Sequence, residues 1–211
     1  MGRSSQRGLS ATVTPKANIF PILLAAGKSP RLGFPQALAQ FDRRSALAIA
    51  VENCSGLPRP IVVLGYQAAR IRRAMPPGVC VVVNRHWRSG QLASLLAGLR
   101  RVPPGAAFML HPVDYPLLTP RVIRRLVVAF RDKLKRHAIV VPTFRGRQGH
   151  PVIFSPEMRD ELANAQTAKE VVGGEKRRVK LVSVGTPAIW QDFNTRTSYR
   201  ICLREYRRHR R

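Results

Sequence analysis

Residues 19–33 read IFPILLAAGKSPRLG, and this stretch decides the fold. Its first six residues, 19–24, form an apolar run that predicts a short buried strand. The loop that follows begins with three small residues at 25–27, which let a ligand approach the backbone closely. Ser29, the backbone N–H groups and Arg31 can then donate to phosphate oxygens. An ordinary strand-to-helix turn with a surface arginine is the alternative, and composition alone leaves both open.

The loop matches neither of the two common phosphate-binding fingerprints. It holds no G-x-G-x-x-G sequence, so it is not a dinucleotide-binding turn. Gly27-Lys28-Ser29 is similar to the end of a P-loop, but Ile22 stands where the first P-loop glycine would be. Pro30 also opposes the helix that must follow a P-loop directly. Phosphate binding here would therefore depend on small residues and individual donors.

Outside this stretch, apolar runs and helical patterns alternate along the chain. Helical spacing predicts helices over residues 45–53, 68–74, 90–101 and 120–136, and apolar runs predict strands over residues 60–65, 79–83, 106–110, 138–142, 151–154 and 179–184. The runs are continuous rather than alternating, which indicates strands buried on both faces. We therefore expect an α/β protein with a mostly parallel, mixed sheet between two layers of helices. In such sheets a ligand binds at the carboxyl ends of the strands, here the loops after Leu24 and Leu110.

The composition fits one domain with a strongly basic surface. The 211 residues include 37 Lys and Arg against 11 Asp and Glu, a formal charge of +26, and 45% are hydrophobic. We expect a basic disordered leader at residues 1–16, one domain at 17–203 and a basic tail at 204–211. The charge favours polyanionic partners. Because no RNA-binding or helix-turn-helix signature accompanies it, nucleic acid is not the partner we expect.

Nothing in the sequence predicts a membrane-spanning segment or a location in an oxidising compartment. No apolar run is long enough to span a bilayer, and the N-terminus lacks the apolar core of a secretory signal. The three cysteines, Cys54, Cys80 and Cys202, are odd in number and widely spaced, which suggests neither a zinc site nor a disulfide framework. We therefore expect a cytoplasmic protein.

Five segments carry a family resemblance, and they occur in the family's order. They are LLAAGKSPRLGFPQAL (23–38), VNRHWRSGQLAS (83–94), PVDYPLL (112–118), RQGHPV (147–152) and DFNTRTSY (192–199). Together they resemble the signature motifs of the molybdenum cofactor cytidylyltransferase-like nucleotidyltransferases. The resemblance implies a Rossmann-like, three-layer α/β/α fold of the nucleotide-diphospho-sugar transferase (GT-A) type.

The same resemblance implies a reaction. These enzymes use Mg²⁺ to transfer a nucleotidyl group from a nucleoside triphosphate to a small acceptor, and they release pyrophosphate. In the branch that this chain resembles, Ala-Ala-Gly at residues 25–27 accompanies CTP, and the acceptor is a molybdopterin-like pterin. A molybdoenzyme is then an implied partner.

Residue by residue, the resemblance implies a site. Arg31 and Asp114 are the implied catalytic residues, the first for the triphosphate and the second, with Asn194, for Mg²⁺. Gly149 and His150 would contact the acceptor. The implied nucleotide-binding residues are Leu24, Ala25, Ala26, Gly27, Ser29, Arg31, Gln36, Asn84, Gln91 and Ser94. For Asn84, Gln91 and Ser94, a structural role at the start of a helix stays open, and His111 is expected only to pack.

The chain departs from the family's pattern at two central positions. Gln36 replaces the loop lysine, so a charged donor is lost, and Asn194 replaces the second metal-site carboxylate, although an amide oxygen can still bind Mg²⁺. Lys28 could supply the missing charge or could be a solvated surface lysine. Asp192 would lie on the same side as Asn194 if the segment is extended.

Three hypotheses follow from these residues. The first is an active nucleotidyltransferase that uses CTP and a pterin-like acceptor. The second is a catalytically degenerate, nucleotide-binding relative that acts as a binding or chaperone subunit, which the losses at Gln36 and Asn194 favour. The third is a polyanion-binding protein on an inherited scaffold.

Overall fold

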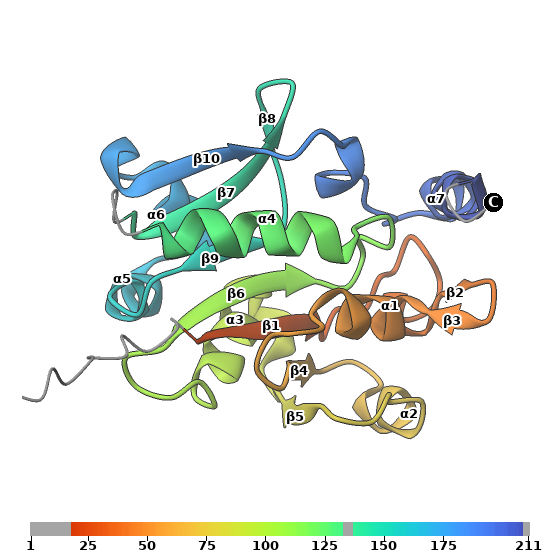
Figure 1. The fold of residues 1–211 in the computed structure, drawn as a ribbon. Coiled ribbons are helices and arrows are strands. Elements are labelled where there is room, and N and C mark those ends of the chain that lie inside the picture. The colour runs from red at the N-terminus through yellow and green to blue at the C-terminus, as the bar shows by residue number, and fades with distance from the viewer. Residues whose placement is uncertain (1–17, 133–136, 209–211) are drawn as a thin grey trace, which may run out of the picture.

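The apolar run that opens the sequence forms the central strand of the sheet. In this computed structural model, which describes residues 18–132 and 137–208, β1 (Ile19–Ala25) lies between β4 and β6 and is parallel to both (Figure 1). Its buried aliphatic side chains alternate between the two faces, so Leu23 joins one apolar cluster and Ile22 the other. A strand of this kind can be stable only between two layers of helices.

The main sheet is mixed, with the order β10-β7-β9-β6-β1-β4-β5. Neighbouring strands in this sheet run parallel, with two exceptions. β9 runs antiparallel to β6 and β7, and β8 pairs antiparallel with β7. The other strands of the main sheet are β4 (Ile61–Leu64), β5 (Cys80–Val83), β6 (Ala107–Pro112), β7 (Ile139–Phe144), β8 (Arg147–Gln148), β9 (Val152–Phe154) and β10 (Val179–Ser183). A separate small hairpin consists of β2 (Gln40–Phe41) and β3 (Arg44–Ser45).

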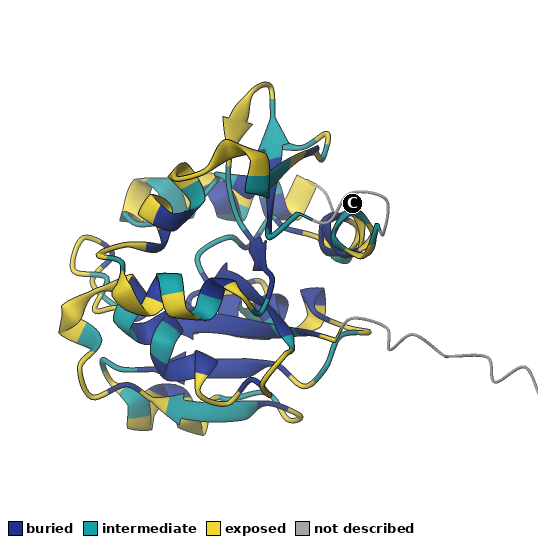
Figure 2. Ribbon diagram, turned by 90° about the vertical axis from the view of Figure 1, so that its left-hand side faces the viewer, coloured by how far each residue is buried: buried dark blue, intermediate teal, exposed yellow. Residues whose placement is uncertain are grey.

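Helices cover both faces of the sheet and leave its central strands buried between them (Figure 2). One face carries α1 (Ala46–Asn53), α2 (Ala68–Arg73) and α4 (Pro120–Arg131). The opposite face carries α3 (Gln91–Leu99), α5 (Met158–Asn164) and α6 (Ala168–Gly173). The last helix, α7 (Arg196–Arg208), packs with Phe41 and Phe193 in a third apolar cluster beside the hairpin. No helix in the described part of the chain is long and apolar enough to cross a membrane.

The structure confirms the predicted fold class and corrects parts of the element list. Each strand predicted from an apolar run is present to within two residues at either end. The helix predicted over 120–136 ends at Arg131, and residues 133–136 lie outside the described part. Helices α5, α6 and α7 were not predicted.

The basic C-terminal segment also differs from the prediction. We expected a tail at 204–211, but residues 204–208 continue α7, and Tyr206 is buried against Phe41 with ring centroids 5.5 Å apart. Aromatic burial therefore attaches this segment to the domain despite its charge. The predicted leader at 1–16 and residues 209–211 lie outside the described residues.

Candidate functional site

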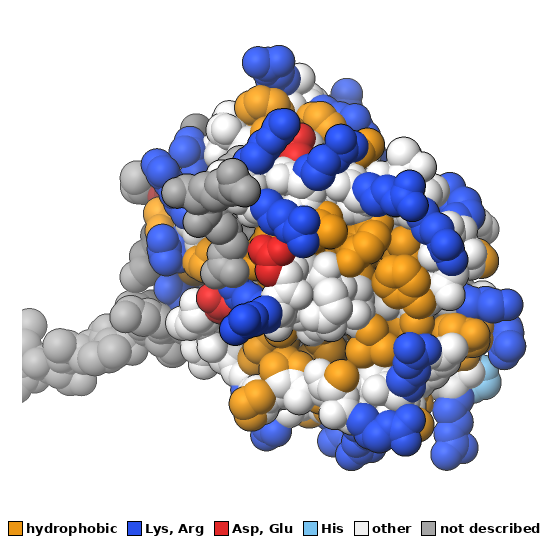
Figure 3. Space-filling model, turned by 90° about the vertical axis from the view of Figure 1, so that its right-hand side faces the viewer, with side chains coloured by type: hydrophobic (Ala, Val, Ile, Leu, Met, Phe, Trp, Pro, Cys, Tyr) orange, Lys and Arg blue, Asp and Glu red, His pale blue; other side chains and the backbone are white. Residues whose placement is uncertain are grey.

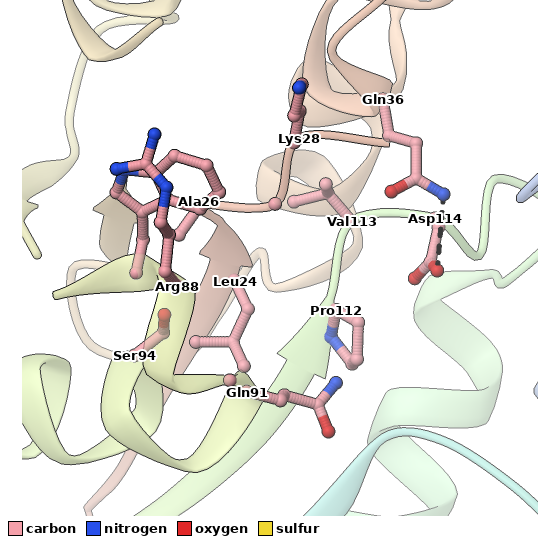
Figure 4. Close-up of a pocket in the computed structure, with 13 residues that line it drawn as sticks. Leu24, Ala26, Lys28, Gln36, Arg88, Gln91, Ser94, Pro112, Val113 and Asp114 are labelled. Carbon is pink, nitrogen blue, oxygen red and sulfur yellow. Dashed lines mark hydrogen bonds between the residues drawn. The ribbon is translucent and has the colours of Figure 1, made fainter. Parts of the chain in front are cut away.

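A cavity of about 450 Å³ opens at the carboxyl ends of β1 and β6, where α/β sheets bind ligands (Figure 4). The loop after β1 forms one wall, the start of α3 a second and the segment after β6 a third. Its lining residues are Leu24, Ala26, Gly27, Lys28, Gln36, Trp87, Arg88, Gly90, Gln91, Ser94, Pro112, Val113 and Asp114. Polar and charged groups thus surround a space of the size that small-molecule sites have.

The small residues after β1 are held in place by the turn after β4. The backbone N–H of Tyr66 donates to the carbonyl oxygen of Ala26 over 3.0 Å. Gly65 has no room for a side chain, because an added Cβ would lie 2.5 Å from Trp87 Cβ and 2.8 Å from the Ala26 oxygen. The two loops and Trp87 therefore pack as one unit, and Ala26 and Gly27 present their backbone to the cavity.

Gln36 connects the loop to the opposite wall of the cavity. Its Nε2 donates to Asn194 Oδ1 and to the Phe193 carbonyl oxygen, each over 3.0 Å, and lies 3.5 Å from Asp114 Oδ2. Its Oε1 accepts a hydrogen bond from Ser29 Oγ over 2.9 Å. The structure thus brings together four of the predicted site residues, Ser29, Gln36, Asp114 and Asn194, around one amide.

Asp114 is a buried carboxyl group in this wall, and its pKa is strongly shifted. The pKa of its carboxyl group is raised to about 7, first by burial and then by the neighbouring charge of Asp192, while hydrogen bonds from its own backbone N–H and from Gln36 oppose the shift. The Oδ1 atom is buried and has no hydrogen-bond partner. A carboxylate oxygen in this situation lacks a cation or donor. Within the described residues no group of three or more His, Cys, Asp and Glu side chains could hold a metal ion. The charge of Asp192 acts on Asp114, and the Gln36 amide links Asp114 to the Asn194 amide.

Three of the predicted nucleotide-binding residues, Asn84, Gln91 and Ser94, divide into two kinds. Gln91 and Ser94 line the cavity from α3. Asn84 does not line it, because its side chain is buried and satisfied: Nδ2 donates to Ser94 Oγ over 3.1 Å, and Oδ1 accepts from the N–H of His86. Asn84 therefore orients Ser94 and the turn after β5.

The predicted acceptor residues pack against Tyr115 and Ile189. The His150 ring packs against Tyr115 with centroids 5.2 Å apart, and burial lowers its pKa to about 4. Gly149 is fixed by close packing, since an added Cβ would lie 2.1 Å from the Ile189 carbonyl oxygen. Neither residue lines the 450 Å³ cavity. His111 is fully buried, as expected for a packing residue, and its Nδ1 lies 2.8 Å from the Pro112 carbonyl oxygen.

Arg31, the predicted triphosphate donor, lies outside this cavity. It is exposed and is not among the residues that line the cavity. The two cations that do line it are Lys28 and Arg88. Arg88 was missed because it lies at a variable position of its motif, and the signal that could have found it is its place directly after Trp87.

Comparisons with known proteins agree with this fold. Residues 21–180 match the MobA-like NTP transferase domain, so the chain belongs to that family. A relative in Paenarthrobacter nicotinovorans, nicotine blue oxidoreductase, is 30% identical over 68% of this chain and 74% of its own. A probable molybdenum cofactor guanylyltransferase of Bacillus cytotoxicus is 23% identical over 62% of this chain and 65% of its own.

A solved structure has the same fold. Rv0371c from Mycobacterium tuberculosis H37Rv superposes with a TM-score of 0.77 at 30% identity, over 89% of this chain and 98% of its own. The same protein has been solved as a complex with manganese, which superposes with a TM-score of 0.75. Because the relatives include both a transferase and an oxidoreductase by name, the reaction has to be argued from the site.

Proposed function

We propose that this protein transfers a nucleotidyl group from CTP to a pterin-like acceptor, with Mg²⁺ and with release of pyrophosphate. The observation that carries the proposal is the convergence of a small-residue loop, a cation-lined wall and an unsatisfied carboxylate on one cavity. Nucleotidyl transfer needs these three elements, because its catalysis consists mostly of positioning and of stabilising charge.

The nucleotide's place follows from the walls. Ala26 and Gly27 allow a base and ribose to lie against the loop, while Gln91 and Ser94 offer hydrogen bonds to the base edge. The preference for CTP is supported by Ala-Ala-Gly at residues 25–27 and by the family's implied pairing of that sequence with CTP. Membership of the MobA-like family supports a triphosphate donor in general.

The donor set of Asp114, Asp192 and Asn194 fits a divalent cation. The fit is tested by Asp114 Oδ1, a buried oxygen without a partner beside a second carboxylate. Mg²⁺ takes oxygen ligands and is held by one or two carboxylates together with substrate phosphates. When bound, it supplies positive charge to the triphosphate. Asp114 and Asn194 would hold it, and Gln36 would orient both side chains through its amide hydrogens.

The chain's own residues have little proton chemistry to perform. An oxygen of the acceptor attacks the α-phosphorus, the bond to the bridging oxygen breaks, and pyrophosphate leaves with that electron pair. An acceptor phosphate is already ionised, so no protein base is needed. Tyr115, which follows Asp114 in the chain, contacts the His150 ring, and a planar pterin acceptor would suit these rings. A molybdoenzyme would receive the product.

A pair of variants tests the proposal. Millimolar CTP with Mg²⁺ should raise the melting temperature of the wild type, because a ligand that binds only the folded state stabilises it. Asp114→Asn should abolish metal-dependent pyrophosphate release while keeping or raising the melting temperature, since it removes an uncompensated buried charge. Asp160→Asn, on the exposed start of α5, is the matched control and should behave as the wild type.

Two results would count against transfer. Pyrophosphate release that survives in Asp114→Asn would move the metal site elsewhere. CTP binding without turnover of any acceptor would support the second candidate, a nucleotide-binding or chaperone subunit. The neutral side chain of Gln36 favours that candidate, because no charge at this position faces the leaving pyrophosphate.

A further inference from the structure

Two cations line the cavity: Lys28, which the sequence offered as a substitute for the missing charge, and Arg88, which was not predicted. Lys28 comes from the loop after β1, and Arg88 from the short 3-10 turn Trp87–Ser89 before α3. Asp114 and Gln36 lie across the cavity from Arg88 (Figure 4). A space with two positive groups and, opposite one of them, a carboxylate with an unpartnered oxygen suits a polyphosphate that bridges these groups.

Two aromatic rings hold these cations in position. The Arg88 guanidinium lies over the indole ring of Trp87 at 4.5 Å from its centroid, and Lys28 Nζ lies 6.0 Å from the centroid of the Tyr66 ring. The two rings contact each other edge to face, with centroids 5.5 Å apart. Cation–π contacts of this kind fix a side chain without using its hydrogen-bond donors.

The donors of both cations are left free for a ligand. Among the described residues, neither Lys28 nor Arg88 forms an ion pair with an acidic side chain. The sequence gives the reason for Arg88, because no Asp or Glu occurs between Glu52 and Asp114. The Arg88 fork is therefore placed at a ligand cavity with an aromatic support and without a competing carboxylate.

We propose that Arg88, assisted by Lys28, binds the triphosphate of the nucleotide in this protein. The proposal rests on the proposed function and deepens it, because it replaces Arg31 and the absent lysine at position 36 by a different pair of cations. Arg88 is then a binding residue for phosphate oxygens, and Trp87 is the residue that positions it. Gln36 can be neutral because Arg88 supplies positive charge from the opposite wall and Lys28 supplies it from the loop.

The test compares three arginines with three ligands by calorimetry. Arg88→Ala should weaken CTP about tenfold to hundredfold, as expected for the loss of a charge-assisted contact, and should weaken inorganic tripolyphosphate to a similar degree. It should leave cytidine binding unchanged. Arg85→Ala, an exposed arginine off the cavity, is the matched control, and Arg31→Ala should cost less than Arg88→Ala. Melting temperatures of all variants establish that they fold.

Positioning by Trp87 has its own readout. Trp87→Leu should reproduce most of the loss for tripolyphosphate, whereas Trp87→Phe, which keeps an aromatic face, should restore it. A loss that is the same for Leu and Phe would show a role in packing alone and would remove Trp87 from the proposal.

The remaining outcomes separate this inference from the proposed function. CTP and tripolyphosphate binding that is unchanged in Arg88→Ala overturns the inference while the proposed function stands. If cytidine and CTP weaken equally, Arg88 does not contact phosphate, which overturns it as well. If the wild type binds tripolyphosphate through Arg88 but binds no nucleotide, the inference holds and the proposed function fails. If the wild type binds neither, both fail.

Discussion

At the scale of single residues, the two departures from the family's pattern lie in direct contact. Gln36 and Asn194 share a 3.0 Å hydrogen bond, so the losses of a lysine and of a carboxylate concern one pair of side chains. In the resembled pattern a positive and a negative group would face each other there, and here two neutral amides do. Replacing one positive and one negative side chain by two neutral amides leaves the net charge of the pair unchanged. Gln36 still holds a hydrogen donor toward Asp114, although it carries no ammonium group.

Three oxygen atoms surround the Gln36 nitrogen, and an amide has only two hydrogens to offer them. Gln36→Lys provides three donors and a charge beside the phosphates. We expect it to tighten CTP binding about tenfold, as one new charge-assisted contact allows, and to raise turnover more than affinity if the contact strengthens as pyrophosphate leaves.

Calorimetry and pyrophosphate release measure both effects. Gln36→Met, similar in length and neutral, is the control and should give no gain in affinity. Equal affinities of the Lys and Met variants would mean that position 36 does not face the phosphates.

At the scale of elements, burial in the sheet creates a dependence of stability on pH. His111 is fully buried on β6, and burial lowers its pKa to about 4, from 6.5 for a free side chain. The unfolded chain therefore takes up this proton first as the pH falls. The contribution of His111 to stability is complete above about pH 6.5 and is lost between there and pH 4.

His111→Phe removes this proton uptake. Between pH 7.5 and pH 5 its free energy of unfolding should fall by about 2 kcal/mol less than that of the wild type. Urea denaturation at the two pH values measures the difference, and His86→Gln, at an exposed histidine, should keep the wild-type dependence. Asp114, whose raised pKa acts with the opposite sign, is common to all three proteins and cancels in the comparison. Parallel losses in wild type and His111→Phe would show that this ring does not control acid stability.

Sequence patterns predicted seven strands of the main sheet and helices α1 to α4, and they missed β8 and helices α5 to α7. β1, β4 and β6 are continuous apolar runs, as strands that are buried on both faces are expected to be. The antiparallel direction of β9 is set by its pairing with β6 and β7, which a local pattern does not record. α7 packs Tyr199, Cys202, Leu203 and Tyr206 into the third apolar cluster at helical spacing, whereas the prediction of a basic tail considered only the arginines of this segment.

The candidate site shows the same division. The motifs predicted that Ser29, Gln36, Asp114 and Asn194 meet, and the structure brings them together. They did not predict that Arg31 lies off the cavity or that Arg88 lines it. A motif records which residues recur, whereas the position of an arginine head group depends on which aromatic ring supports it.

At the scale of the whole molecule, the charge of +26 is unevenly distributed. Positive side chains cover much of the surface that Figure 3 shows, with few acidic ones among them. All five ion pairs in the described part of the chain use acids outside residues 53–113, because that stretch contains eight arginines and no acid. It forms β4, α2, β5, α3 and β6, so one half of the domain carries unneutralised charge beside the cavity.

This field should attract a triphosphate from a distance and should be sensitive to salt. At physiological ionic strength, charges act over about 8 Å, and at 1 M salt over about 3 Å. Arg70, Arg72 and Arg73 on α2 are exposed and do not line the cavity, so they contribute to the field without touching a bound nucleotide. Replacing all three by Glu lowers the net charge by six units and leaves the cavity intact.

We expect this triple variant to slow CTP association several-fold at low salt, because electrostatic steering sets the rate of encounter for charged ligands. The dissociation rate should change little, since no contact with bound CTP is lost. Stopped-flow measurement with a fluorescent CTP analogue at about 0.02, 0.15 and 1 M salt follows both rates, and the two proteins should converge at the highest salt. A matched variant with all three arginines replaced by Gln should have an association rate between those of the wild type and the Glu variant, in proportion to its charge. If the difference in association rate between the two proteins is as large at high salt as at low salt, α2 contacts the nucleotide directly. The arginines of α2 would then be part of the binding site.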